Sequence, residues 1–116
     1  MKTSSAKAKG RRCSQEVKEL ILRFFGTEMR EDDITVTPSG VTGPDLMFSP
    51  LAKGLLGLAI ECKNVESLNV WKSLEQAENE GRHGTPTLFF RRNRSKLYVA
   101  LEAEEFLNIL AKANIK

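Results

Sequence analysis

The sequence predicts a single α/β domain in which a central mixed sheet is flanked by helices. Apolar residues have helical spacing near both ends of the chain, an aliphatic run occupies residues 55–63, and short strand-like segments lie around that run. The chain has 116 residues and 41% hydrophobic content, which suits one modest core. We expect the element order α-β-β-β-α-β-β-α.

The first predicted element is an amphipathic helix that begins at Ser14 as its N-cap and ends at Gly26. The apolar residues with helical spacing in this segment are Val17, Leu20, Ile21, Phe24 and Phe25. Glu16 borders the buried face, whereas Glu19 faces solvent. Residues 1–12 are rich in Lys, Ser and Ala, so we expect a flexible basic arm before a domain formed by residues 13–116.

Three strands are expected next. Residues 34–37 alternate and are β-branched, and they enter the turn Pro38-Ser39-Gly40. A short apolar strand follows Asp45. Residues 49–54 are then expected to form a hairpin connection into the central strand at residues 55–63.

The second half of the chain is expected to hold two helices and two strands. A helix from Ser67 to Glu80 would bury Val70, Trp71, Leu74 and Ala77, with Gln76 nearer its solvated side. Strands are predicted at residues 87–90 and 97–101. A final helix at residues 103–113 would bury Phe106, Leu107, Leu110 and Ala111.

Basic residues are concentrated in two segments of the chain. Residues 1–12 and 82–96 each hold five basic residues and no acidic one, so the remainder, with 8 basic and 15 acidic residues, is net acidic. Such segregation favours a surface that faces a polyanion. The expected nucleic-acid-binding residues are Lys9, Arg11, Arg12, Arg82, Arg91, Arg92, Arg94 and Lys96. An ordinary solvated turn is the alternative for residues 91–96, and His83 is expected at the surface.

The central strand ends in Glu61-Cys62-Lys63. Side chains alternate along a strand, so Glu61 and Lys63 share one face while Cys62 packs in the core on the other. Two charges on an aliphatic strand are costly to bury unless a cation and a phosphate compensate them. Asp45 is expected beside Glu61. The alternative is an ion pair at a strand end, with Asp45 only a turn residue after Pro44.

Pro44-Asp45 followed by Glu61-Cys62-Lys63 resembles the motif of the PD-(D/E)xK nuclease superfamily. The order of Gly10, Glu16 and the Pro38-Ser39-Gly40 loop is further similar to that of archaeal-type Holliday junction resolvases, which are small homodimers. This resemblance implies a restriction-endonuclease-like α-β-β-β-α-β core over about residues 10–100.

The resemblance also implies an active site for phosphodiester hydrolysis. Asp45, Glu61 and the backbone carbonyl of Cys62 would bind Mg²⁺, for which Mn²⁺ can substitute, and Lys63 would lie near the attacking water and the phosphate. Glu16 and Ser39 would lie near the metal. A divalent ion suits this reaction because it neutralises the phosphate and activates water. Simpler explanations exist for Glu16, as an acid in a first helical turn, and for Ser39, as a turn residue.

We therefore expect a Mg²⁺-dependent DNA endonuclease that cuts branched DNA, such as a Holliday junction, as a homodimer with two active sites. The alternatives are a repair or restriction-type nicking nuclease and a non-catalytic nucleic-acid-binding domain of the same fold. RNA remains open as a substrate. No apolar run approaches membrane-spanning length and two cysteines suggest no disulfide framework, so we expect an intracellular, cytoplasmic protein away from membranes.

Overall fold

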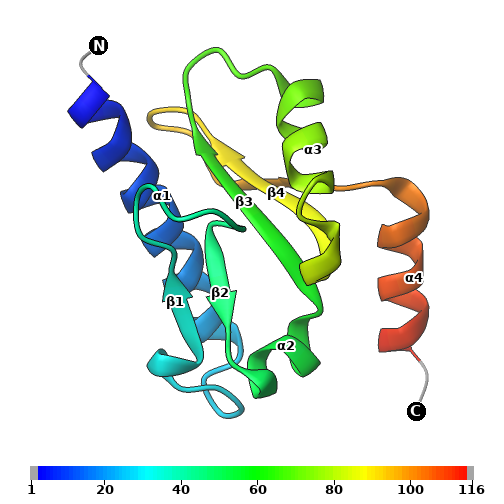
Figure 1. Ribbon diagram of the computed structural model, residues 1–116. Helices are drawn as coiled ribbons and strands as arrows, with labels where there is room; N and C mark the ends of the chain where they lie inside the picture. Colours follow the sequence, from blue (N-terminus) through cyan, green and yellow to red (C-terminus); the bar gives the residue numbers. More distant parts are fainter. Residues whose placement is uncertain (1–2, 115–116) are drawn as a thin grey trace.

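The computed structural model describes residues 3–114, with side chains from residue 6 onward. It is an α/β structure, as the sequence predicts (Figure 1). Its elements in chain order are α1 (Thr3–Phe24), η1 (Glu31–Asp33), β1 (Ile34–Val36), β2 (Leu46–Phe48), α2 (Pro50–Leu56), β3 (Leu58–Asn64), α3 (Val70–Glu78), η2 (Gly81–His83), β4 (Thr85–Arg91), β5 (Tyr98–Ala100) and α4 (Ala103–Ala113).

The strands form two sheets rather than the single central sheet that was expected. Strands β1 and β2 make an antiparallel pair, and the order in the second sheet is β3-β4-β5, with β3 parallel and β5 antiparallel to β4. The second sheet is therefore mixed, as predicted. The two sheets meet where the Asp45 N–H donates to the Ile60 carbonyl at 2.9 Å. Pairing stops there because β2 is only three residues long and leads directly into α2.

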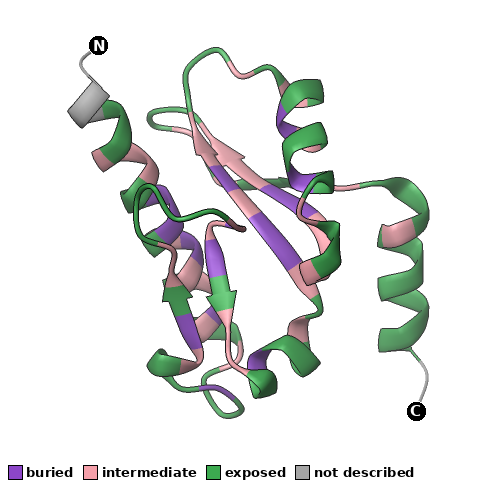
Figure 2. Ribbon diagram, viewed as in Figure 1, coloured by how far each residue is buried: buried purple, intermediate pink, exposed green. Residues whose placement is uncertain are grey.

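The core lies between α1 and the strands. Val17 and Cys13 of α1 pack in one cluster with Ile34, Ile60 and Cys62, and all of these side chains are buried. Figure 2 shows the buried segments concentrated on α1, β2, β3 and β4. Helix α3 packs on β3 and β4 on the other side of the three-stranded sheet (Figure 1). Cys62 is a core residue, as expected, and faces α1.

Helix α1 begins much earlier than the sequence suggested. It starts at Thr3, so Ser14 lies inside the helix, 5% exposed, and is not its N-cap. Residues 3–12 of the expected arm are helical, and the Lys9 ammonium lies 3.8 Å from the Glu66 carboxylate. The physical reason is helix propensity, because Ala, Lys and Arg dominate this segment. Residues 1–2 of the arm lie outside the described part of the chain.

The connection into the central strand is a helix, not a hairpin loop. Helix α2 has Ser49 as its N-cap, whose hydroxyl oxygen accepts a hydrogen bond from the Ala52 N–H, and Pro50 in its first turn. Gly57 ends it in the left-handed conformation, with φ of 62°. Strand β3 therefore begins at Leu58, and Leu55 and Leu56 belong to α2.

One residue of the predicted buried face of α3 and the whole predicted face of α4 are open to solvent, whereas Val70 and Leu74 of α3 are half-buried. Asn69 rather than Ser67 caps α3, and Trp71 is 84% exposed instead of buried, although Ala77 is buried and Gln76 exposed as expected. Helix α4 has no buried residue, and its apolar residues Phe106, Leu107, Leu110 and Ala111 are all exposed. The helix stands beside the domain, where the Thr85 hydroxyl donates to Glu105 at 3.1 Å. None of the helices in residues 3–114 has the length and hydrophobicity needed to cross a membrane.

Candidate functional site

Asp45 lies against the middle of β3. Its N–H donates to the Ile60 carbonyl at 2.9 Å, and its Oδ2 accepts a hydrogen bond from the Cys62 N–H at 2.7 Å. These two bonds hold the carboxyl group of Asp45 close enough to that of Glu61 for each group to change the pKa of the other. The structure thus brings together Asp45 and Glu61, which are separated by fifteen residues in the chain and by α2.

Crowding of the two carboxyl groups changes their titration. Burial and the negative charge of Asp45 raise the pKa of Glu61 to about 7, against the opposing effect of the Lys63 ammonium. Burial also raises the pKa of Asp45, although the Cys62 N–H stabilises its ionised form. The charge of each carboxyl group therefore affects the ionisation of the other.

Lys63 and Asp45 both line a hollow of about 340 Å³ between α1 and the loop that follows β1. Lys7, Gly10, Arg11 and Ser14 form its α1 wall, and Ser39 lies on the opposite wall. The Arg11 guanidinium donates to the Ser39 hydroxyl oxygen at 3.4 Å, which connects the two walls. The hollow therefore combines the carboxyl group of Asp45, two lysines and an arginine in a space open to solvent, and Glu61 lies next to it rather than in its wall.

A divalent cation fits the donors at this site. Because the N–H and C=O of one residue point to the same edge of a strand, and the Cys62 N–H points to Asp45, the Cys62 carbonyl also points away from β4 toward Asp45. Two carboxylates and a carbonyl are the oxygen ligands that Mg²⁺ prefers, with water completing its shell. Within residues 3–114, no cluster of three or more His, Cys, Asp or Glu side chains is arranged to hold a metal, so the carbonyl would be required.

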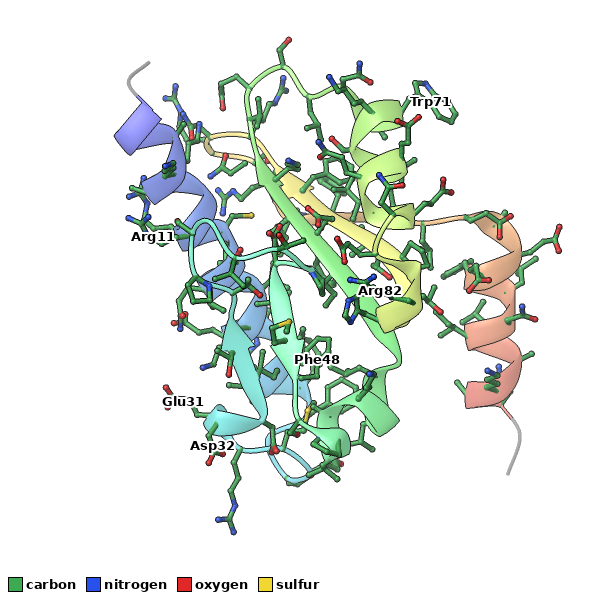
Figure 3. The ribbon with its side chains drawn as sticks, in the orientation of Figure 1. Arg11, Glu31, Asp32, Phe48, Trp71 and Arg82 are labelled. Carbon is green, nitrogen blue, oxygen red and sulfur yellow. The ribbon has the colours of Figure 1, made fainter. Side chains whose placement is uncertain are left out.

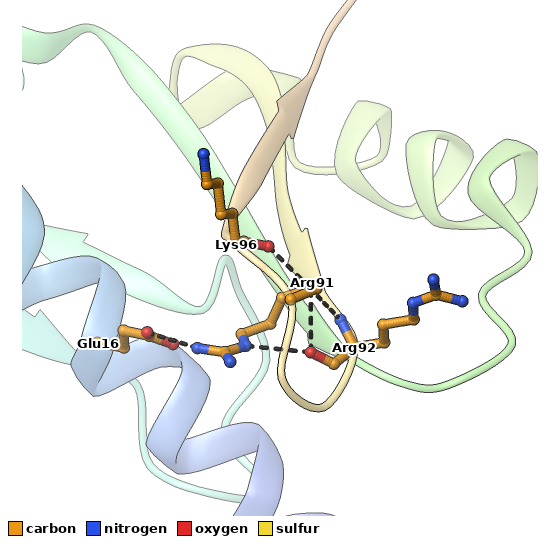
Figure 4. Close-up of polar contacts among 5 residues, drawn as sticks. Glu16, Arg91, Arg92 and Lys96 are labelled. Atoms are coloured by element: carbon orange, nitrogen blue, oxygen red, sulfur yellow. Dashed lines mark hydrogen bonds and ion pairs between the residues drawn. The ribbon is translucent and has the colours of Figure 1, made fainter.

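Glu16 lies elsewhere. Its carboxylate accepts a hydrogen bond from the Arg91 guanidinium at 2.7 Å (Figure 4). The two residues line a second hollow of about 460 Å³, which shares Asn64 with the first. Asn64, like Cys62, faces the α1 side of β3. The structure therefore pairs Glu16 with an arginine of β4 and does not bring it to the Asp45–Glu61 pair.

Two residues near the pair were not expected from the sequence. The negative charge of Glu80 contributes to the raised pKa of both Asp45 and Glu61. Ser14, interpreted as an N-cap, instead lines the hollow with Asp45. Glu80 lies two residues after the end of α3. No local pattern signals that it approaches the two carboxyl groups, because this depends on how α3 packs on the sheet. His83 is partly buried, with its Nε2 3.5 Å from the Glu80 carboxylate, rather than simply at the surface.

The expected nucleic-acid-binding residues occupy three places. The β4–β5 turn carries exposed Arg92, Arg94 and Lys96, and it is closed by the Ser95 hydroxyl oxygen, which accepts a hydrogen bond from the Arg92 N–H at 3.0 Å. The α1 residues Lys9, Arg11 and Arg12 lie beside the two hollows. Arg82 precedes β4 and so lies at the other end of that strand from the turn. Arg11 and Arg82 are labelled in Figure 3.

No protein-family profile matches the chain, and no curated protein or solved structure shows significant similarity to it.

Proposed function

We propose that this protein is a metal-dependent endodeoxyribonuclease with a restriction-endonuclease-like core, of the Holliday junction resolvase type within the PD-(D/E)xK superfamily. The observation that supports the proposal most strongly is the hydrogen bond from the Cys62 N–H to Asp45, which holds the Asp45 carboxylate beside Glu61. A simple ion pair between Glu61 and Lys63 does not explain why a second carboxylate lies there. A bound cation explains it, because a cation relieves the repulsion between the two acids.

The residues have distinct roles in this proposal. Asp45, Glu61 and the Cys62 carbonyl hold Mg²⁺, which when bound neutralises phosphate charge and makes its water more acidic. Lys63 orients the attacking water and stabilises charge on the scissile phosphate. Arg11 and Lys7, on the α1 wall of the same hollow, hold the DNA backbone on which that phosphate lies. Ser39 positions Arg11 through their hydrogen bond.

Branched DNA is the proposed substrate, cut by a homodimer with two active sites. Lysine and arginine side chains border the hollow, and the exposed arginines of the β4–β5 turn extend the basic surface. Such phosphate contacts position a protein on DNA without reading its sequence, which favours recognition of shape. A role in recombination or repair follows from that choice of substrate.

The test compares wild-type protein with Asp45→Ala and Lys63→Ala on labelled four-way, flap, nicked and linear DNA, with Mg²⁺ and with a chelator. We expect paired symmetric incisions of the four-way DNA by the wild type, and at least a ~100-fold loss of cleavage in both variants. Their affinity for DNA should persist because the basic residues are retained. Asp32→Ala, which removes an exposed carboxylate outside the site, is the matched control and should cleave normally.

The outcomes separate the candidate functions. Incisions on nicked or linear DNA alone would replace the resolvase with a nicking nuclease. Binding without any metal-dependent cleavage by the wild type would indicate a non-catalytic nucleic-acid-binding domain, and equal cleavage by Asp45→Ala and wild type would remove the proposed site.

A further inference from the structure

Trp71 is the only tryptophan of the chain, and it is 84% exposed. Its helix packs through Ser73 and Ala77, which are buried, so the indole contributes nothing to the contact between α3 and the sheet. A large flat apolar side chain exposed to this degree does not stabilise the fold through burial, so its presence needs another explanation.

The position of Trp71 relates it to the basic surface. Strands β3 and β4 are parallel and paired with Asn64 opposite Arg91, so the segments that follow them leave from the same end of the sheet. One segment leads to Trp71 and the other is the β4–β5 turn with Arg92 and Arg94. In Figure 1 both lie at the upper end of the sheet. Lys63 of the proposed active site is the second-last residue of β3, at this same end.

The two segments are joined by direct hydrogen bonds. The Asn93 N–H donates to the Glu66 carboxylate at 2.6 Å, and the Val65 N–H donates to the Arg91 carbonyl at 3.1 Å. Glu66 also lies 3.8 Å from the Lys9 ammonium of α1. The chain leading to α3 is therefore held against the arginine turn and against α1.

The first turn of α3 is fixed as well. The Asn69 carboxamide oxygen accepts a hydrogen bond from the Lys72 N–H at 3.0 Å, and the Ser73 hydroxyl donates to the Asn69 carbonyl at 2.9 Å. Figure 3 shows Trp71 projecting away from the body of the protein at this end of α3. Hydrogen bonds thus fix the backbone that carries the indole, at the end of the sheet from which the β4–β5 turn also leaves.

We propose that Trp71 is a stacking platform for an unpaired nucleobase of the DNA substrate. Bases stack on exposed aromatic rings when their faces are free, while neighbouring cations hold the backbone. Paired bases inside a duplex have no free face, so this contact favours DNA with unstacked bases at a branch or a single-stranded segment. The inference rests on the proposed nuclease function for the assignment of DNA, and it adds a reason for selecting branched substrates.

Because Trp71 is the only tryptophan, fluorescence excited at a wavelength that Tyr98 does not absorb reports on Trp71 alone. Wild-type protein in chelator is titrated with a four-way junction, a single-stranded oligonucleotide and a blunt linear duplex, while labelled-DNA anisotropy measures binding. We expect quenching by the first two DNAs and little by the duplex. Trp71→Ala should weaken junction binding by roughly tenfold, and Trp71→Phe, which keeps a ring, by less.

Phe24→Ala is the matched control, because Phe24 is 73% exposed at the far end of α1, where the Arg23 guanidinium covers its ring. It should bind the junction as the wild type does. Junction binding without quenching, or unchanged affinity in Trp71→Ala, would overturn the inference. So would a change in solution mass of Trp71→Ala by sedimentation, which would assign the indole to a protein interface. These measurements need no cleavage. Quenching in a protein that never cuts DNA would therefore support the base-stacking role of Trp71 and contradict only the nuclease proposal.

Discussion

Glu61 and Glu16 are two acidic side chains with opposite surroundings. Glu61 of β3 lies beside a second carboxyl group, and its pKa is raised to about 7, whereas Glu16 of α1 is bound to the Arg91 guanidinium at 2.7 Å. Folding pairs Glu16 with a cation, whereas it places Glu61 beside the negative charge of Asp45. The difference teaches that an unbalanced charge indicates a site for a ligand more strongly than an ion pair does.

The largest effect expected from this comparison concerns Glu61. Its pKa is higher in the folded protein than the usual 4.5, so the folded state binds more protons between about pH 4.5 and 7, and the free energy of unfolding falls as pH rises through that range. Solvent screens this half-exposed group, so we expect a fall of roughly 1–2 kcal/mol. Urea unfolding in chelator at several pH values measures it.

Glu61→Gln should remove most of this pH dependence and abolish cleavage, while Glu16→Gln should leave the dependence intact. Adding Mg²⁺ at pH 8 should raise the melting temperature of the wild type but not of Glu61→Gln, because a ligand that binds only the folded state stabilises it. A wild-type stability that is flat between pH 5 and 8 would mean that the two carboxyl groups do not repel each other.

The next effect concerns the arginine turn. Replacing Arg92 with Gln and Arg94 with Asn should lower the slope of log affinity for DNA against log salt by about 2, because each arginine displaces counterions from phosphates. Asn is chosen at position 94 because Arg94 has a φ of 61°, a left-handed conformation that Asn tolerates. Arg82→Gln, at the other end of β4, is the control and should change the slope less. Equal slopes for all variants would place the DNA elsewhere.

The smallest effect is expected for Glu16. Glu16→Gln breaks a partly exposed ion pair, which should lower the free energy of unfolding by less than about 1 kcal/mol. Cleavage should continue, and DNA affinity should rise slightly because the Arg91 guanidinium is released. Chemical denaturation and nicking assays measure both quantities. A ~100-fold loss of cleavage would instead show that Glu16 acts with Asp45, as the family resemblance implies, and would end the contrast.

Several features of the fold could be predicted from local pattern alone. Residues 58–63 read as a buried strand because aliphatic side chains are continuous there, and the alternation of Glu61, Cys62 and Lys63 follows from strand geometry. The start of α1 was missed because a capping signal at Ser14 was given more weight than the helix propensity of the basic segment before it. Helix α2 was missed because Ser49-Pro50 suits both a turn and a helix start.

The candidate site depended more on packing. The sequence alone identified Asp45, Glu61, Lys63 and the two basic segments as candidates, because composition and the alternation of side chains along a strand are local properties. Only the tertiary structure decided that Glu16 pairs with Arg91, that Glu80 approaches the carboxyl pair, and that Trp71 and the apolar face of α4 stay exposed. An amphipathic pattern shows that a helix has an apolar face but does not show which element covers that face. The approach of distant side chains depends on how the helices pack on the sheet.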